Sequence, residues 1–188
     1  MEEITTLLER VRAGDSAAED ALARAVYDHL RSLARQQRRR WRGEAPLDTT
    51  ALVHETWLKV ARGGYENRGH FFAVATRAIR QLLVNQAERH RAQRRGGGAP
   101  HVPLDEANAL VTTDDDAHTI LSVASAVDKL RDRDAELATL VEYRFFAGFT
   151  VEEIAELTAQ SPRTIKRRWQ RARAWLAVTL DDPAEFAT

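Results

Sequence analysis

The sequence predicts an all-α protein made of two small helical domains joined by a flexible linker, with a helix-turn-helix in the second domain. Two features of the hydrophobic pattern indicate helices. Apolar residues recur every three or four positions over most of the chain, and no segment alternates apolar and polar residues as a strand would. A glycine- and proline-rich stretch at 96–103 indicates the linker, because these residues interrupt helices and leave the backbone flexible.

The composition limits the classes of protein to consider. The chain has 188 residues, 44% of them hydrophobic, which suits a globular protein of one large or two small domains. It has no cysteine, so disulfides and thiolate metal sites are excluded. No run approaches the ~18 apolar residues of a membrane span, and the first residues lack the apolar core of a signal peptide. We therefore expect a cytoplasmic protein without a membrane segment, metal or cofactor.

The charges are unevenly distributed although the formal net charge is zero. Residues 1–95 carry 18 Lys and Arg against 12 Asp and Glu, residues 96–128 carry six acids and no base, and residues 129–188 carry ten of each. Such asymmetry favours two domains and a connection between them. The predicted divisions are a first domain at 1–95, a linker at 96–117 and a second domain at 118–180.

The first domain is predicted to contain four helices. They are a short one before Gly14 and longer ones at about 16–41, 50–61 and 71–95. Ser16 and Glu19 fit a capping box, in which two side chains satisfy two free backbone N–H groups at the start of the second helix. Glycines at 14 and 63–64 separate neighbouring helices.

The second domain is predicted to begin with helices at about 119–130 and 134–147, the latter ended by Gly148. A pair of capped helices follows. Thr150 caps the first member, and Ser161 caps the second, with Pro162 at its first position. Two helices joined by a turn of three or four residues make a helix-turn-helix.

The second helix of this pair has a basic face. Positions 163, 166, 167 and 170 share that face, and Ile165 and Trp169 lie opposite. Side chains near the start of such a helix reach base edges in the major groove, and others bind phosphates. A basic run by itself more often marks a solvated surface, but the helix-turn-helix around this one favours DNA binding.

Three other features carry weaker signals. Arginine clusters at 38–40 and 89–95 can bind phosphates or be solvated helix ends. The 62–70 loop contains Tyr65 and Asn67, which can stack on and hydrogen-bond an unstacked base, although its composition alone favours a plain connector. His54 and Glu55 begin like a zinc-protease helix, but Leu58 occupies the position of the second histidine, so we expect no enzyme and no metal.

Four segments, taken together, resemble the extracytoplasmic-function (ECF) group of bacterial sigma factors. The segment 52–60 (LVHETWLKV) is similar to the family's polymerase-docking helix, and 71–85 (FFAVATRAIRQLLVN) to its promoter-melting helix. The segments 145–155 (FFAGFTVEEIA) and 161–167 (SPRTIKR) are similar to its reader of the −35 promoter element. The resemblance implies a first domain that docks on core RNA polymerase and opens the −10 element, and a second that reads the −35 element.

The resemblance assigns candidate residues to each task. Duplex DNA at −35 would be met by Arg163, Thr164, Lys166, Arg167, Gln170 and Arg171. The melted non-template strand at −10 would be met by Tyr65, Asn67, Arg80, Gln81 and Asn85. Core RNA polymerase would be met by Leu52, His54, Glu55 and Leu58.

Two departures from the family pattern have consequences. The turn at 158–160 reads Thr-Ala-Gln where the family has a central glycine, so a positive φ at Ala159 would cost roughly 1 kcal/mol. Thr49 and Thr50 stand before the docking helix where typical members have acids. Phosphorylation by a Ser/Thr kinase would supply the missing negative charge, and the simpler interpretation is that Thr50 is an N-cap.

Two other functions remain open. An operator-binding transcriptional regulator with an N-terminal sensing domain accounts for the helix-turn-helix but not for the 52–60 and 71–95 segments. An arginine-rich RNA-binding module accounts for the charge but leaves the second domain without a task. For the sigma-factor interpretation, an anti-sigma factor is a further potential partner.

Overall fold

The computed structural model describes residues 67–95 and 114–180 without interruption. It also describes most residues between 6 and 28, residues 55 and 56, and residue 65. In these parts of the chain every regular element is a helix and no strand occurs, so the predicted all-α class is confirmed. The labelled helices are α4 (Arg68–Arg95), α5 (Asp114–Arg131), α6 (Ala135–Phe145), α7 (Val151–Leu157) and α8 (Pro162–Thr179).

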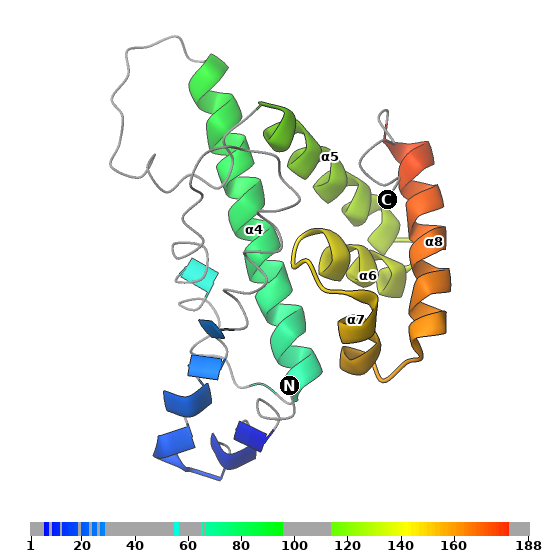
Figure 1. Ribbon diagram of the computed structural model, residues 1–188. Coiled ribbons are helices and arrows are strands. Elements are labelled where there is room, and N and C mark those ends of the chain that lie inside the picture. The colour runs from blue at the N-terminus through cyan, green and yellow to red at the C-terminus, as the bar shows by residue number, and fades with distance from the viewer. Residues whose placement is uncertain are drawn as a thin grey trace.

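The long helix α4 runs beside α5 and also contacts α6, while α8 packs on the side of α6 away from α4, and α7 pairs with α8 (Figure 1). Buried side chains from all five of these helices form one hydrophobic cluster. Edge-to-face rings connect its parts: Phe71 contacts Phe72, Phe72 contacts Phe149, and Phe149 contacts Tyr143, with centroids 5.0–5.5 Å apart. The start of α4 is therefore packed on the same core as α5–α8, a group of helices that we call the α5–α8 unit.

Two helices begin earlier than predicted. Helix α4 starts at Arg68 rather than 71, because the Asn67 side-chain oxygen accepts a hydrogen bond from the His70 N–H at 2.9 Å and caps the first turn. Helix α5 starts at Asp114, so residues 114–117 of the predicted linker are helical. Three consecutive aspartates occupy its first turn, where the helix dipole stabilises negative charge.

Two predicted caps are wrong. Asp15, not Ser16, caps the second N-terminal helix, since its carboxylate accepts hydrogen bonds from the N–H groups of Ala17 and Ala18 and Ser16 is already helical. Helix α6 ends at Phe145 with Phe146 as the C-cap, and Gly148 lies beyond it with a φ of +74°. Most of the helices predicted at 16–41 and 50–61 lies outside the described residues.

The α7–α8 pair forms as its sequence predicts. Thr150 caps α7 and shares a capping box with Glu153, and Ser161 caps α8 with Pro162 at the first helical position. The turn between them, residues 158–161, contains Ala159 with a φ of +52°. No helix in the described residues is long and apolar enough to cross a membrane.

Candidate nucleic-acid interface

Helix α8 separates its basic side chains from its apolar ones. Ile165 and Trp169 are 2% and 8% exposed and belong to the core, whereas the opposite face is open to solvent. Among the residues predicted to meet duplex DNA, the exposed ones are Arg163, Lys166, Arg167, Gln170 and Arg171. The helix therefore presents a row of donors on the side that faces away from the protein.

Thr164 differs from its neighbours because its side chain takes part in the helix cap. It is half-buried, and its Oγ1 lies 2.8 Å from the Ser161 Oγ, which also accepts a hydrogen bond from the Thr164 N–H. A base contact by Thr164 would have to share this hydroxyl. The structure thus gives Thr164 a structural task that the sequence pattern did not predict.

Two ion pairs fix α8 to the start of α6. Arg168 lies 2.7 Å from a Glu136 carboxylate oxygen, and the Arg171 guanidinium lies 3.7 Å from Asp134. Asp134 is also the N-cap of α6, where its side chain accepts from the Leu137 N–H. The two acids therefore connect the start of α6 to α8 through Arg168 and Arg171.

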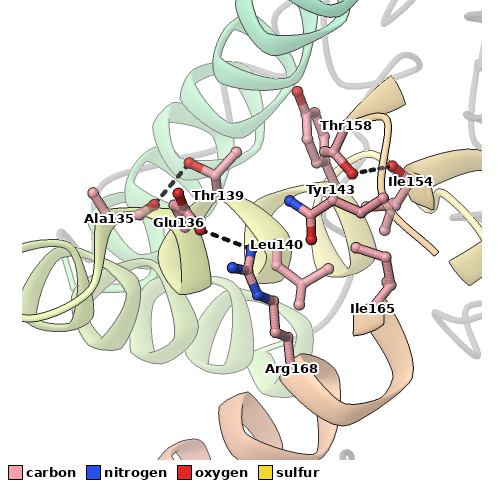
Figure 2. Close-up of a pocket in the computed structure, with 10 residues that line it drawn as sticks. Ala135, Glu136, Thr139, Leu140, Tyr143, Ile154, Thr158, Ile165 and Arg168 are labelled. Carbon is pink, nitrogen blue, oxygen red and sulfur yellow. Dashed lines mark hydrogen bonds and ion pairs between the residues drawn. The ribbon is translucent and has the colours of Figure 1, made fainter. Parts of the chain in front are cut away.

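An apolar pocket of about 340 Å³ lies where α6, α7 and α8 meet (Figure 2). Its walls include Leu140, Tyr143, Ile154 and Ile165, and the Arg168–Glu136 ion pair crosses one side. Burial raises the pKa of the Tyr143 phenol, which further favours its neutral form. The pocket therefore results from the packing of the α7–α8 pair against α6.

A half-buried arginine on α6 also contacts α8. Arg144 lies over the ring of Trp169, 5.3 Å from its centroid, and donates a hydrogen bond to the Phe149 carbonyl at 2.7 Å. Burial lowers the pKa of its guanidinium, and the nearby carboxylates of Glu152 and Glu153 oppose that effect. Arg144 therefore connects α6, the loop before α7, and α8.

The start of α4 holds the first two residues predicted for −10 recognition. Tyr65 is half-buried, its ring packs edge-to-face on Phe71 at 5.0 Å and on His70 at 5.9 Å, and burial raises the pKa of its phenol. Asn67 is exposed, with its oxygen engaged in the cap of α4. Residues 68–70 of the predicted loop belong to the helix.

Further along α4, the remaining predicted residues diverge in their surroundings. Gln81 is exposed and donates to the Asn85 side-chain oxygen at 2.8 Å, so this pair stays at the surface. Arg80 turns toward the α5–α8 unit instead. Its guanidinium lies 2.7 Å from Asp128 and 3.1 Å from Glu142.

Few of the other predicted residues fall in the described part of the chain. Glu55 is exposed, as a polymerase contact requires, and its neighbour Thr56 is fully buried. The other predicted polymerase contacts, Leu52, His54 and Leu58, and the predicted phosphorylation sites Thr49 and Thr50, lie outside the described residues. Within the described residues, no group of His, Asp and Glu side chains is arranged to hold a metal ion.

The sequence model of the ECF sigma factor family matches residues 1–182. The chain belongs to the ECF sigma factors. It therefore binds core RNA polymerase and directs promoter-specific initiation of transcription as a regulatory factor. The comparisons found no matching curated protein and no matching solved structure.

The ion pairs that join distant segments of this sigma factor could not be predicted from its sequence. Glu142 has a side chain only 3% exposed, and Arg80 from α4 and Arg131 from α5 both contact it, at 3.1 and 2.6 Å. The available signal was a glutamate in the mostly apolar segment 140–146 (LVEYRFF), because a buried carboxylate needs cationic partners. No local sequence pattern identifies Arg80 and Arg131 as the partners of Glu142.

Proposed function

We propose that α8 reads the −35 element of the promoter as duplex DNA. The supporting observation is the exposed face formed by Arg163, Lys166, Arg167 and Gln170 opposite the buried Ile165 and Trp169. Arg163 and Arg167 lie near the helix start and one turn on, where bidentate contacts to guanine are feasible. Lys166 and Arg171 are exposed on the same helix and would bind phosphates, which need a cation but no bidentate base contact.

We also propose that the start and middle of α4 handle the melted −10 strand. Tyr65 offers a ring for stacking, the Asn67 amide N–H₂ remains available to donate, and Gln81 with Asn85 adds polar groups on the exposed side. Arg80 would bind the strand's phosphates once released from its acidic partners. Docking on polymerase would use the face of the 50–61 segment that bears Glu55, together with Leu52, His54 and Leu58.

The test of this assignment is run-off transcription in two steps. Core polymerase supplied with the protein should initiate at specific sites on genomic templates, and core polymerase alone should not. A double variant, Asn67→Ala with Arg80→Ala, should impair initiation on duplex templates more than on pre-melted templates. Equal loss on both templates would contradict a role in melting, and failure to associate with polymerase at all would contradict the function itself.

Regulation by a Ser/Thr kinase at Thr50 or Thr49 is a further proposal for this sigma factor. A phosphate would add about −1.5 to −2 charges near the start of the docking segment, where the sequence has only Asp48. Polymerase affinity is to be compared for unmodified protein, phosphorylated protein and phosphorylated Thr50→Ala and Thr49→Ala variants. Full affinity of the unmodified protein, unchanged by phosphorylation, would show that no such switch exists.

A further inference from the structure

The pocket between α6, α7 and α8 has the size and lining of a small-molecule site. Its volume of about 340 Å³ lies at the lower end of the roughly 300–1,000 Å³ that such sites occupy. Buried apolar and aromatic side chains contribute most of its walls (Figure 2); they are Leu140, Tyr143, Ile154 and Ile165. A lining of this kind suits an apolar ring rather than an ion.

Most polar groups of the pocket already have partners within the protein. Arg168 and Glu136 pair at 2.7 Å along one side, where the Glu136 side chain is 71% exposed to solvent. Thr139 and Thr158 also line the pocket, and each hydroxyl donates its hydrogen to a backbone carbonyl one helical turn earlier. These groups therefore have hydrogen bonds or ion pairs without a ligand.

The Gln160 side chain differs from these groups. It lines the same pocket from the turn between α7 and α8, and its Oε1 is buried without a hydrogen-bond partner among the described residues. A buried oxygen without a donor is unfavourable, and most such oxygens in proteins have one. Rotation about the last torsion of the side chain, which is broad, can turn this oxygen toward the pocket, and the oxygen loses no hydrogen bond by turning. The pocket therefore offers one free acceptor beside an apolar lining.

We propose that this pocket binds a small molecule made of an apolar ring system with one hydrogen-bond donor. The ring lies against Ile154 and Ile165, and its N–H or O–H donates to the Gln160 Oε1. Ile165 is buried opposite the basic face of α8, so the bound molecule leaves Arg163 and Arg167 open to solvent. Such a molecule contacts α8 without blocking the face assigned to DNA. The site itself does not depend on whether α8 reads the −35 element.

Indole and benzofuran are matched probes for this site, because they share one fused-ring shape and only indole carries an N–H donor. Binding is followed by methyl NMR of the full chain labelled at isoleucine. Ile154 and Ile165 line the pocket, whereas Ile79 in α4 and Ile120 in α5 do not. Indole should shift the signals of the first pair alone, with a dissociation constant of about 0.1–1 mM. Benzofuran should bind roughly three- to tenfold more weakly.

Two variants, each with a matched control, separate the acceptor from the cavity. Gln160→Leu removes the acceptor and should abolish the difference in affinity between indole and benzofuran. Gln170→Leu makes the same change at an exposed position on α8 outside the pocket, and should preserve that difference. Thr139→Phe fills the pocket from α6 and should abolish the methyl shifts with both probes. Thr139→Val, which nearly keeps the size of the side chain, should preserve them.

Several results would overturn the proposal. Equal affinity of the wild type for the two probes, or a preference for indole that persists in Gln160→Leu, would rule out recognition by Gln160. Absence of shifts at Ile154 and Ile165 with millimolar indole, or shifts that survive Thr139→Phe, would rule out the pocket as the site. Unchanged signals of Ile79 and Ile120 before the probe is added verify that each variant is folded.

Discussion

Arg167 and Arg168 are neighbours on α8 but have different surroundings. Arg167 points to solvent on the basic face, whereas Arg168 turns back to Glu136 at 2.7 Å. The sequence predicted the basic face from the positions of Ile165 and Trp169. It could not predict which arginines would be engaged by acids of α6, because those partners are about thirty positions away and no local spacing marks them.

At Arg167 we expect substitution to affect recognition rather than folding. Arg167→Ala should weaken binding of the holoenzyme to its promoter by about 1–3 kcal/mol and relax preference at one base pair of the −35 element. Titration of holoenzyme against a set of singly substituted promoters measures both effects. Arg133→Ala, at an exposed position in the turn after α5, is the control and should leave affinity unchanged. Unaltered affinity and preference in Arg167→Ala would mean that α8 enters the groove in another orientation.

Ala159 carries a second residue-level expectation. Its φ of +52° lies in the left-handed region, where a Cβ is unfavourable. Ala159→Gly should raise the free energy of unfolding by about 0.5–1 kcal/mol, as seen by chemical denaturation. Ala174→Gly, inside α8, should lower it by a similar amount. The same change of sign for both variants would show that the turn is not strained.

Asp15 and Ser16 mark the limit of prediction from local sequence. Both residue types are good N-caps, so propensity alone does not choose between them. In the structure Asp15 is the cap, and Arg10 of the preceding helix donates to its carboxylate at 2.7 and 3.0 Å. That hydrogen bond lowers the pKa of Asp15 and keeps the cap charged. The deciding partner lies in the preceding helix, outside the capping pattern.

Among the helices, those with strong end signals were the ones predicted well. Thr150 and Ser161 each cap a helix as expected, because hydroxyl acceptors, Pro162 and an early glutamate all favour the same start. Helices α4 and α5 extend beyond their predicted starts, since Asn67 and the aspartates at 114–116 were interpreted as a base-reading loop and a linker. The predicted helix boundaries were wrong at residues whose type suits both a helix start and another role.

The capping box of α7 gives a prediction at the level of the element. Thr150→Ala removes the acceptor for the Glu153 N–H and should lower the free energy of unfolding by about 1 kcal/mol. Thr139→Ala is the matched control. Its hydroxyl bonds only to the Ala135 carbonyl within α6, so its loss should change stability by less than about 0.5 kcal/mol. Equal effects of the two variants, measured by urea denaturation, would argue against a distinct role of the cap.

In the whole molecule, the feature that the sequence did not reveal is the shared core of α4 and the α5–α8 unit. A composition shift and a glycine-rich stretch suggested two domains, and the domain boundaries remain a prediction. The contacts that join the parts are between residues far apart, such as Phe72 with Phe149 and Arg80 with Glu142. Periodicity identifies which face of a helix is apolar but not which helix will cover it.

Phe72 tests whether this shared core folds as one unit. Its side chain is fully buried, so Phe72→Ala should cost about 3–5 kcal/mol through lost burial and the cavity left behind. With Trp41, Trp57 and Trp175 replaced by phenylalanine, Trp169 fluorescence reports from α8 and far-ultraviolet circular dichroism from all helices. Both signals should then shift together to lower urea concentration. A Trp169 signal that keeps its wild-type midpoint while helicity falls earlier would show that α4 and α8 unfold independently.

The pairing of Arg80 with Asp128 also has a consequence for how promoter binding responds to ionic strength. An unpaired arginine that meets a phosphate releases cations condensed on the nucleic acid, which makes affinity fall steeply with salt. In the proposed role of Arg80, the phosphate displaces the Asp128 carboxylate, and the freed carboxylate attracts cations of its own. The wild type should therefore show a shallower dependence of log affinity for single-stranded DNA on log salt than Asp128→Asn, by up to roughly 0.7 per contact exchanged. Through its own acids, this sigma factor would hold its DNA affinity more constant as the salt content of the cell changes.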